Sequence, residues 1–189
     1  MKSPVILALA LCLAGIAFAG PITYTATLTG PGESPPNASP GTGFATVTID
    51  TMAHTLFVDV SFSGLLGTTT ASHIHCCTAV PFTGTANVAT QTPTFAGFPL
   101  GVTSGIYMNT FDTSLTATYN APFVTGNGGT AAGAEAALAA GLASGVAYLN
   151  IHSTVDPGGE IRGFLVPVPE PATFGGVALL LAGLYWRRR

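Results

Sequence analysis

The sequence predicts an all-β domain, a β-sandwich with one short helix, between an N-terminal signal peptide and a C-terminal apolar helix. Hydrophobic residues alternate with Thr, Ser and Asp over several short runs, and such alternation is typical of strands with one buried face. The chain has 24 glycines and 14 prolines, many of them between these runs, where they favour turns. Residues 20–167 are enough for one domain core.

The first three predicted strands are residues 22–29, 43–50 and 56–62. In the third, the even-numbered residues are Leu, Val, Val and Phe, whereas the odd-numbered residues are Phe, Asp and Ser. Residues 51–54 predict a hairpin connection, and residues 30–41, which contain four prolines, predict a surface loop because proline fits neither a helix interior nor a central strand.

Five further strands are predicted at residues 68–75, 104–109, 115–119, 146–152 and 160–166. Residues 130–143 are alanine-rich with leucines in helical register, and Gly145 follows where a helix would end. Many short strands with Gly and Pro turns and a single helix favour a β-sandwich.

The N-terminus predicts a signal peptide over residues 1–19. Lys2 supplies a basic start and residues 5–16 an apolar stretch. Ala17 and Ala19 place small residues where signal peptidase reads the chain, so we expect cleavage after Ala19. The domain is therefore expected to be exported.

The C-terminal tail, residues 168–189, has three parts. Val168-Pro169-Glu170-Pro171 precedes an apolar run over residues 173–186, and Arg187-Arg188-Arg189 ends the sequence. Basic residues after an apolar helix hold that end on the cytoplasmic side of the inner membrane. The helix would span roughly 21 Å of a hydrocarbon core of roughly 30 Å. We therefore expect transient insertion into the inner membrane.

This order of motif, apolar helix and arginine cluster resembles the PEP-CTERM sorting signal of Gram-negative bacteria. The resemblance implies that an exosortase cuts the tail near Pro-Glu-Pro after export. The product would reside on the cell surface or in the extracellular matrix. An ordinary C-terminal membrane helix is the alternative interpretation.

The charge of the domain excludes one class of partner. Of the five basic residues only Arg162 lies within residues 20–167, against seven of the eight acidic residues, a formal net charge of about −6. Such a domain cannot neutralise a phosphate backbone, so no nucleic acid is expected as a partner. Cys76 and Cys77 are its only cysteines. Adjacent cysteines cannot join distant elements, which makes the pair a redox or metal candidate.

Two histidine segments are candidate metal ligands. His73 and His75 lie two residues apart on a predicted strand and therefore share one face. His152 ends a second strand, and the turn after it leads back to Glu160. Imidazoles with a carboxylate suit copper, zinc or iron, and Cys76 and Cys77 would add soft ligands.

The competing interpretation is structural. A His-x-His pair on a strand is often a hydrogen-bonded polar face. Glu160 and Arg162 would then form an ion pair that holds the last hairpin, since Arg162 is the only cation of the domain and favours a carboxylate partner. His54, in the turn at residues 51–54, is expected to be solvated.

Five separated segments within residues 22–166 resemble the CHRD domain, which is named for chordin and occurs in exported bacterial proteins. They are Glu33-Ser34-Pro35-Pro36 with Gly41 and Gly43, Gly64-Leu65, Ala71-Ser72-His73-Ile74-His75, Tyr148-Leu149-Asn150-Ile151-His152, and Pro157-Gly158-Gly159-Glu160-Ile161-Arg162-Gly163. The resemblance implies an immunoglobulin-like β-sandwich without an assigned enzymatic activity. Many members continue His-Ile-His with Gly-Pro, where this chain has Cys76-Cys77.

Three functions follow from these observations. The first is a non-catalytic exported surface protein, with signal peptidase, an exosortase and surface polysaccharide as partners. The second is a metal-binding domain that holds copper or zinc through His73 and His75. The third is a redox enzyme that resembles superoxide dismutase in its His-x-His spacing. Because no Gly-x-Ser-x-Gly elbow or Gly-rich phosphate loop is present, we expect no enzyme.

Overall fold

The computed structural model describes residues 20–169. The predicted signal peptide with its cleavage site after Ala19, and the tail from Glu170 to Arg189, lie outside the described residues. The elements in chain order are β1 (Ile22–Thr29), η1 (Gly30–Gly32), β2 (Thr42–Asp50), β3 (Thr55–Ser63), β4 (Thr69–Cys76), β5 (Gly105–Asp112), η2 (Thr116–Thr118), α1 (Ala121–Gly126), α2 (Ala131–Ala143), β6 (Ala147–Ser153), β7 (Ile161–Phe164) and β8 (Val166–Pro167).

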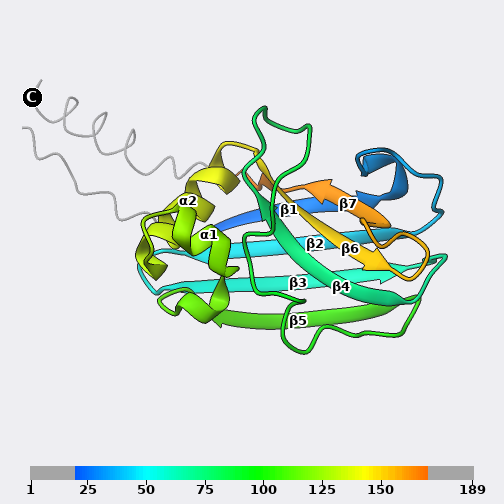
Figure 1. Ribbon diagram of the computed structural model, residues 1–189, viewed down its shortest axis with the longest axis horizontal. Helices are drawn as coiled ribbons and strands as arrows, with labels where there is room; N and C mark the ends of the chain where they lie inside the picture. The colour runs from blue at the N-terminus through cyan, green and yellow to red at the C-terminus, as the bar shows by residue number, and fades with distance from the viewer. Residues whose placement is uncertain (1–19, 170–189) are drawn as a thin grey trace, which may run out of the picture.

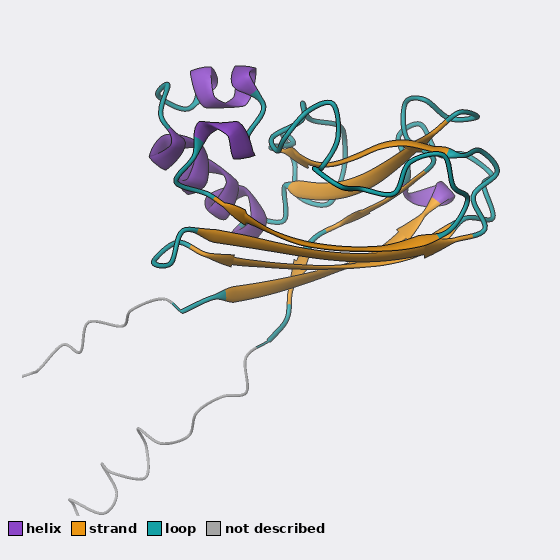
Figure 2. Cartoon of the chain, turned by 90° about the horizontal axis from the view of Figure 1, so that it is seen from below, coloured by secondary structure: helices purple, strands orange, loops and turns teal. Residues whose placement is uncertain are grey.

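The strands form one antiparallel sheet in the order β4-β6-β7-β1-β2-β3-β5, and β8 pairs with β1. The sheet curls, so that β4 and β6 cross over the layer made by β1, β2, β3 and β5 (Figures 1 and 2). This confirms the predicted all-β architecture with two layers of strands. Among the described residues, no helix has the length and apolar character needed to cross a membrane.

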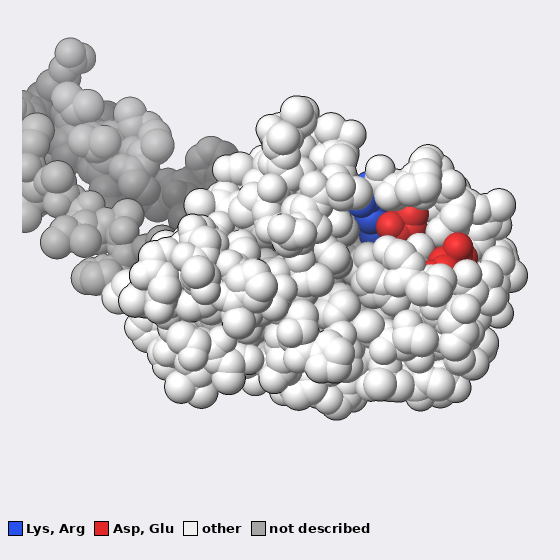
Figure 3. All heavy atoms as spheres, in the orientation of Figure 1, with Lys and Arg blue, Asp and Glu red and all other residues white. Residues whose placement is uncertain are grey.

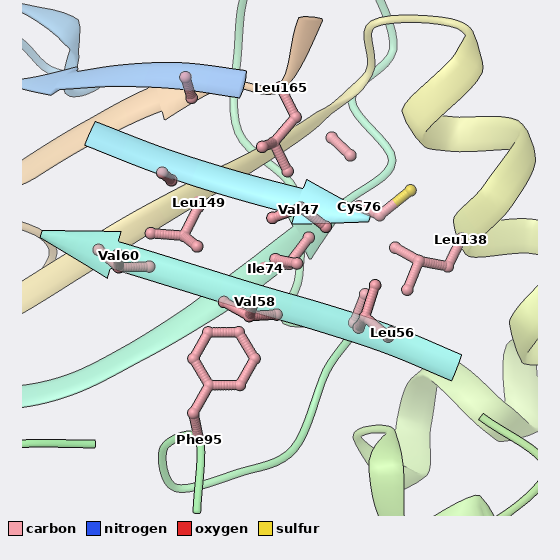
Figure 4. Packing of buried hydrophobic residues seen from close by; sticks show 14 of the residues in the cluster. Val47, Leu56, Val58, Val60, Ile74, Cys76, Phe95, Leu138, Leu149 and Leu165 are labelled. Atoms are coloured by element: carbon pink, nitrogen blue, oxygen red, sulfur yellow. The ribbon is translucent and has the colours of Figure 1, made fainter. Parts of the chain in front are cut away.

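The core lies between the two layers of strands. Leu56, Val58 and Val60 of β3 are fully buried, as their alternation with polar residues predicts. Ile74 of β4 lies toward these side chains from the other layer, as Figure 4 shows. Leu138 of α2 belongs to the same buried cluster. Each layer thus contributes one face of alternating side chains to a single core.

The helices differ in part from the prediction. The predicted helix at residues 130–143 is present as α2, and the Thr130 side chain caps it by accepting a hydrogen bond from the Gly133 amide at 3.1 Å. A second short helix, α1, was not predicted, although Pro122 in its first turn is a typical start signal. The prediction of one short helix was therefore incomplete.

The predicted strand at residues 115–119 is wrong, because this segment contains η2. The Thr118 hydroxyl donates to the Asp112 carbonyl at 2.5 Å, and the Tyr119 amide donates to the Thr116 carbonyl at 3.1 Å. These bonds fold the chain back on the end of β5, and only Tyr119 keeps a strand-like partner, in an isolated bridge to Thr90.

The turn between β2 and β3 has the predicted position, and the Asp50 side chain accepts from the Met52 and Ala53 amides at 2.9 Å. His54 is not simply solvated, since its Nδ1 lies 3.0 Å from a carboxylate oxygen of Glu135 on α2. This contact ties the hairpin to the helix.

Candidate metal centre

Strands β4, β6 and β7 carry polar side chains on the face directed away from the core. His73 pairs with Asn150 in the strand register, and His75 pairs with Tyr148. His152 lies opposite Ala71. Because the intervening residues point into the core, all these side chains share the outer face.

The outer face of β4 is nevertheless buried. The segment that follows β4 runs along the free edge of this strand, where Val88 pairs with His75 and the Ala89 amide donates to the Ile74 carbonyl. Its carbonyl groups contact the histidines of β4. His73 is 6 % exposed and His75 is 8 % exposed. The result is a buried polar layer, to which this segment contributes backbone carbonyl groups.

Each of the three imidazoles bonds to a backbone carbonyl through one ring nitrogen. His73 Nε2 lies 2.5 Å from the Pro93 carbonyl oxygen, His75 Nδ1 2.9 Å from that of Ala86, and His152 Nδ1 2.8 Å from that of Pro157. A carbonyl oxygen can only accept, so these nitrogens carry the proton. The carbonyls thereby fix the tautomer and the orientation of each ring.

The other nitrogen of each ring carries no proton and has a free electron pair. His73 Nδ1, His75 Nε2 and His152 Nε2 are buried and have no hydrogen-bond partner among the described residues, and neither has Asn150 Oδ1. The three histidines each offer a ligand nitrogen within 4.8 Å of the others. The three histidines therefore lie close enough together to share one ion, and each has one unpartnered ring nitrogen.

The environment keeps these rings neutral. Burial, aided by the neighbouring His152 and His75, lowers the pKa of His73 to about 4, against the opposing effect of the hydrogen bond to Pro93. Burial also lowers the pKa of His75 and of His152. Neutral imidazole is the form that binds a metal ion.

Three neutral imidazoles that present bare nitrogens can coordinate one transition-metal ion. Three histidines are a known ligand set of zinc, and imidazole also suits copper. A backbone carbonyl on the second nitrogen is the usual outer partner of a metal-bound histidine. The sequence had placed His73 and His75 on one face; the structure adds His152 to them.

Cys76 and Cys77, predicted as further ligands, do not join this cluster. Their sulfurs are bonded to each other in a disulfide, so neither is a thiolate. Cys76 is at the end of β4 on the core face, and a methyl group at Gly141 of α2 would lie 2.2 Å from its sulfur. Strand alternation thus directs Cys76 away from the histidines.

Glu160, the other predicted ligand, is occupied elsewhere. Its carboxylate accepts hydrogen bonds from the Ser39 hydroxyl at 2.6 Å, the Leu66 amide at 2.5 Å and the Gly67 amide at 3.2 Å. Burial would raise the pKa of Glu160, but these bonds, with one to Ser153, lower it overall. It ties three segments of the chain together at the end of the sheet.

The predicted ion pair between Glu160 and Arg162 is wrong, because Arg162 pairs with Glu33. Its Nε lies 3.7 Å from Glu33 Oε2, and both side chains are about 95 % buried. Glu33 belongs to the proline-rich loop, which folds over the outer face and reaches β7. Glu33 also accounts for glycine at position 159, because a Cβ there would lie 2.6 Å from Glu33 Oε1.

The sequence patterns predicted no functional role for Glu33. Burial raises its pKa to about 7, although Arg162 and the Ser34 amide lower it. The only available signal was a glutamate ahead of two prolines in an otherwise uncharged loop. Asp156 is in the turn before Gly159 and adds to the raised pKa.

Two family models match the chain. The model of the CHRD domain matches residues 24–165. The chain belongs to the CHRD domain family. All three histidines, the disulfide and the Glu33–Arg162 pair lie within this CHRD domain.

The second model, the PEP-CTERM protein-sorting motif, matches residues 167–189. The CHRD domain is thus part of an exported protein that an exosortase sorts to the surface of a Gram-negative cell. No curated protein matches the chain, and no solved structure matches it.

Proposed function

We propose that this protein is a metal-binding CHRD domain that holds one copper or zinc ion at the cell surface through His73, His75 and His152. The observation that carries the proposal is a cluster of three histidines that each offer a ligand nitrogen within 4.8 Å of the others. Each of them also has a buried nitrogen without a hydrogen-bond partner among the described residues. A buried polar atom without a partner costs free energy, and one cation would satisfy all three.

The character of the unpartnered atoms favours a cation over a water molecule. The three nitrogens and Asn150 Oδ1 are all acceptors, because the N–H of each ring already faces a carbonyl. One water molecule donates two hydrogen bonds and would leave acceptors unsatisfied. A metal ion accepts electron pairs from all of them.

The nature of the ligands narrows the choice of ion. Three imidazoles without a carboxylate suit zinc or copper and are poor ligands for calcium or magnesium, which bind oxygen. At equal availability the general affinity order favours Cu²⁺ over Zn²⁺. We infer that the site binds Cu²⁺ more tightly than Zn²⁺ in solution.

We infer that the bound ion serves binding or structure rather than catalysis. Asn150 lies opposite His73 in the strand register, and its Oδ1 is a fourth unpartnered acceptor on the same face. Four protein ligands are typical of structural sites, whereas catalytic sites keep one position for water. The burial of His73 and His75 supports the same assignment.

We also propose the finer steps of delivery. Signal peptidase removes residues 1–19, the tail inserts transiently into the inner membrane, and exosortase cleavage releases the domain to the surface or the extracellular matrix. The combination of a CHRD domain with a PEP-CTERM motif supports this order.

Calorimetric titration of copper and zinc into the processed protein tests the proposal. His73→Ala, His75→Ala and His152→Ala should each weaken binding by more than the roughly 10–100-fold that loss of an outer partner costs. His54→Ala is the matched control, because His54 contacts Glu135 rather than the cluster. Equal binding by the four variants, or no saturable binding by the parent, would refute the proposal.

A further inference from the structure

A pocket beside the metal centre contains the Glu33–Arg162 pair. Its volume is about 430 Å³, and its lining includes Glu33, Arg162, Phe82, Phe164, Thr29 and Thr83. Figure 3 shows acidic atoms beside basic atoms, with a second acidic group nearby, on a face that is otherwise white. This combination of two buried charges, two aromatic rings and hydroxyl groups has no role in the proposed metal site.

Arg162 has hydrogen-bonding capacity left for a ligand. Nε donates to the Gly32 carbonyl at 2.6 Å and Nη1 donates to the Gly84 carbonyl at 3.1 Å. A guanidinium carries five N–H donors, and these two bonds fix its plane. The guanidinium carbon lies 4.6 Å from the centre of the Tyr148 ring and 5.7 Å from that of Phe164, so the charged group is held rigidly.

Glu33 supplies the complementary acceptor. Its Oε2 faces Arg162 at 3.7 Å, and its Oε1 is buried without a hydrogen-bond partner in the described part of the chain. Glu33 also lines the pocket, so its carboxylate can accept a hydrogen bond from a ligand hydroxyl. Donor and acceptor thus stand side by side at the pocket.

Phe82 forms an exposed aromatic wall of this pocket. The residue is 57 % exposed, and its φ of 60° is in the left-handed region that bulky residues rarely adopt. The ring packs on Gly145 at one side, where a Cβ would lie 2.4 Å from Cζ. Backbone strain that holds an apolar ring at the surface is typical of binding sites.

The charges define the class of ligand. An anion would be repelled by Glu33 and by Asp156, which is close enough to affect Glu33. A cation would be repelled by Arg162. A neutral molecule with neighbouring hydroxyl groups avoids both penalties, because each hydroxyl donates and accepts. An apolar face on the same molecule would pack on Phe82.

We propose that the pocket between Phe82 and the Glu33–Arg162 pair binds a neutral saccharide. Adjacent sugar hydroxyls donate to Glu33 and accept from Arg162, and the C–H face of the ring stacks on Phe82. The sorting of this protein to the cell surface brings the pocket into contact with extracellular glycans. This inference does not depend on the metal centre.

The test is a titration of the processed protein with neutral tetrasaccharides of glucose, mannose, galactose and N-acetylglucosamine, and with tetragalacturonate as the acidic analogue. At least one neutral tetrasaccharide should bind saturably. Phe82→Ala and Glu33→Gln should each weaken that binding about tenfold, the usual effect of losing one hydrogen bond to a charged group or one stacking contact.

Phe44→Ala is the matched control, because Phe44 is also an exposed aromatic, at 49 %, but lies on β2 outside the pocket. It should leave the affinity unchanged. Phe82 is at the surface, so its variant keeps the test informative even if Glu33→Gln does not fold. The proposal is overturned if no neutral tetrasaccharide binds, if tetragalacturonate binds more tightly, or if Phe44→Ala has the larger effect. Metal content measured on the same variants separates this result from the metal proposal.

Discussion

The imidazole rings of His73 and His152 lie 5.1 Å apart between centroids, although the two residues come from different segments of the chain. Strand β6 lies beside β4 in the sheet, and its register places His152 diagonally across from His73. The two rings are inclined at 70°, and each offers a ring nitrogen to the cluster, whose ligand atoms lie within 4.8 Å of one another. This relationship brings a third imidazole to the His-x-His pair.

The histidines should make the metal-free protein sensitive to acid. Their pKa values are lowered in the fold, to about 4 for His73, whereas histidines in the unfolded chain protonate near pH 6.5. The unfolded state then binds more protons, so the free energy of unfolding should fall as the pH drops from about 6.5 to about 4. Urea unfolding at several pH values measures this slope. His73→Gln should reduce this slope; an unchanged slope in His73→Gln would contradict the prediction.

Glu33 should produce the opposite pH dependence. The fold raises its pKa from 4.5 to about 7, so its contribution to stability is fully present below about 4.5 and is lost as the pH rises through about 7. The free energy of unfolding of Glu33→Gln, measured relative to that of the parent, should therefore be higher at pH 8 than at pH 5. Thermal unfolding at both pH values checks this, with Asp59→Asn on β3 as control. An equal change in stability at both pH values would show that burial does not raise the pKa of Glu33.

The Cys76–Cys77 disulfide should contribute little to stability and nothing to metal binding. A bond between neighbours closes no long loop in the unfolded chain, and the sulfurs are outside the histidine cluster. Replacing both cysteines with Ser should lower the melting temperature by a few degrees, the scale of about 1 kcal/mol. Differential scanning calorimetry and metal titration measure the two effects. Loss of metal in the double variant would place the cysteines in the site.

The tail should be a processing signal. The PEP-CTERM motif covers residues 167–189, and the apolar run is short for a lasting anchor. Intact mass of the protein from an exosortase-positive Gram-negative host should correspond to a chain that ends close to Pro169-Glu170-Pro171. Recovery of chains that end at Arg189 from the same host would contradict this expectation.

The local pattern was enough to predict most strands and one part of the site. Alternation predicts strands because the side-chain period of two is a property of the backbone, and the same period places His73 and His75 on one face. It could not predict which strand lies beside β4, since that depends on the curl of the whole sheet. For this reason His152 stayed one of several candidate ligands.

Contacts made by loops could not be predicted from the sequence. Glu33 reaches Arg162 because the proline-rich loop folds over β7, and Glu160 turns instead toward the amides of Leu66 and Gly67. Neither the loop path nor the choice between two carboxylates has a periodic signal. Helix α1, with six residues, was also too short to show a helical repeat.

The metal content of the processed protein is the most direct test of the proposed function. The protein is purified without chelators or nickel resin and analysed for copper and zinc by inductively coupled plasma mass spectrometry. We expect close to one ion per chain, reduced to background in His73→Ala and His152→Ala and retained in His54→Ala. Metal at background level in the parent protein, after incubation with either ion and removal of the excess, would contradict the assignment of these three histidines as a metal centre.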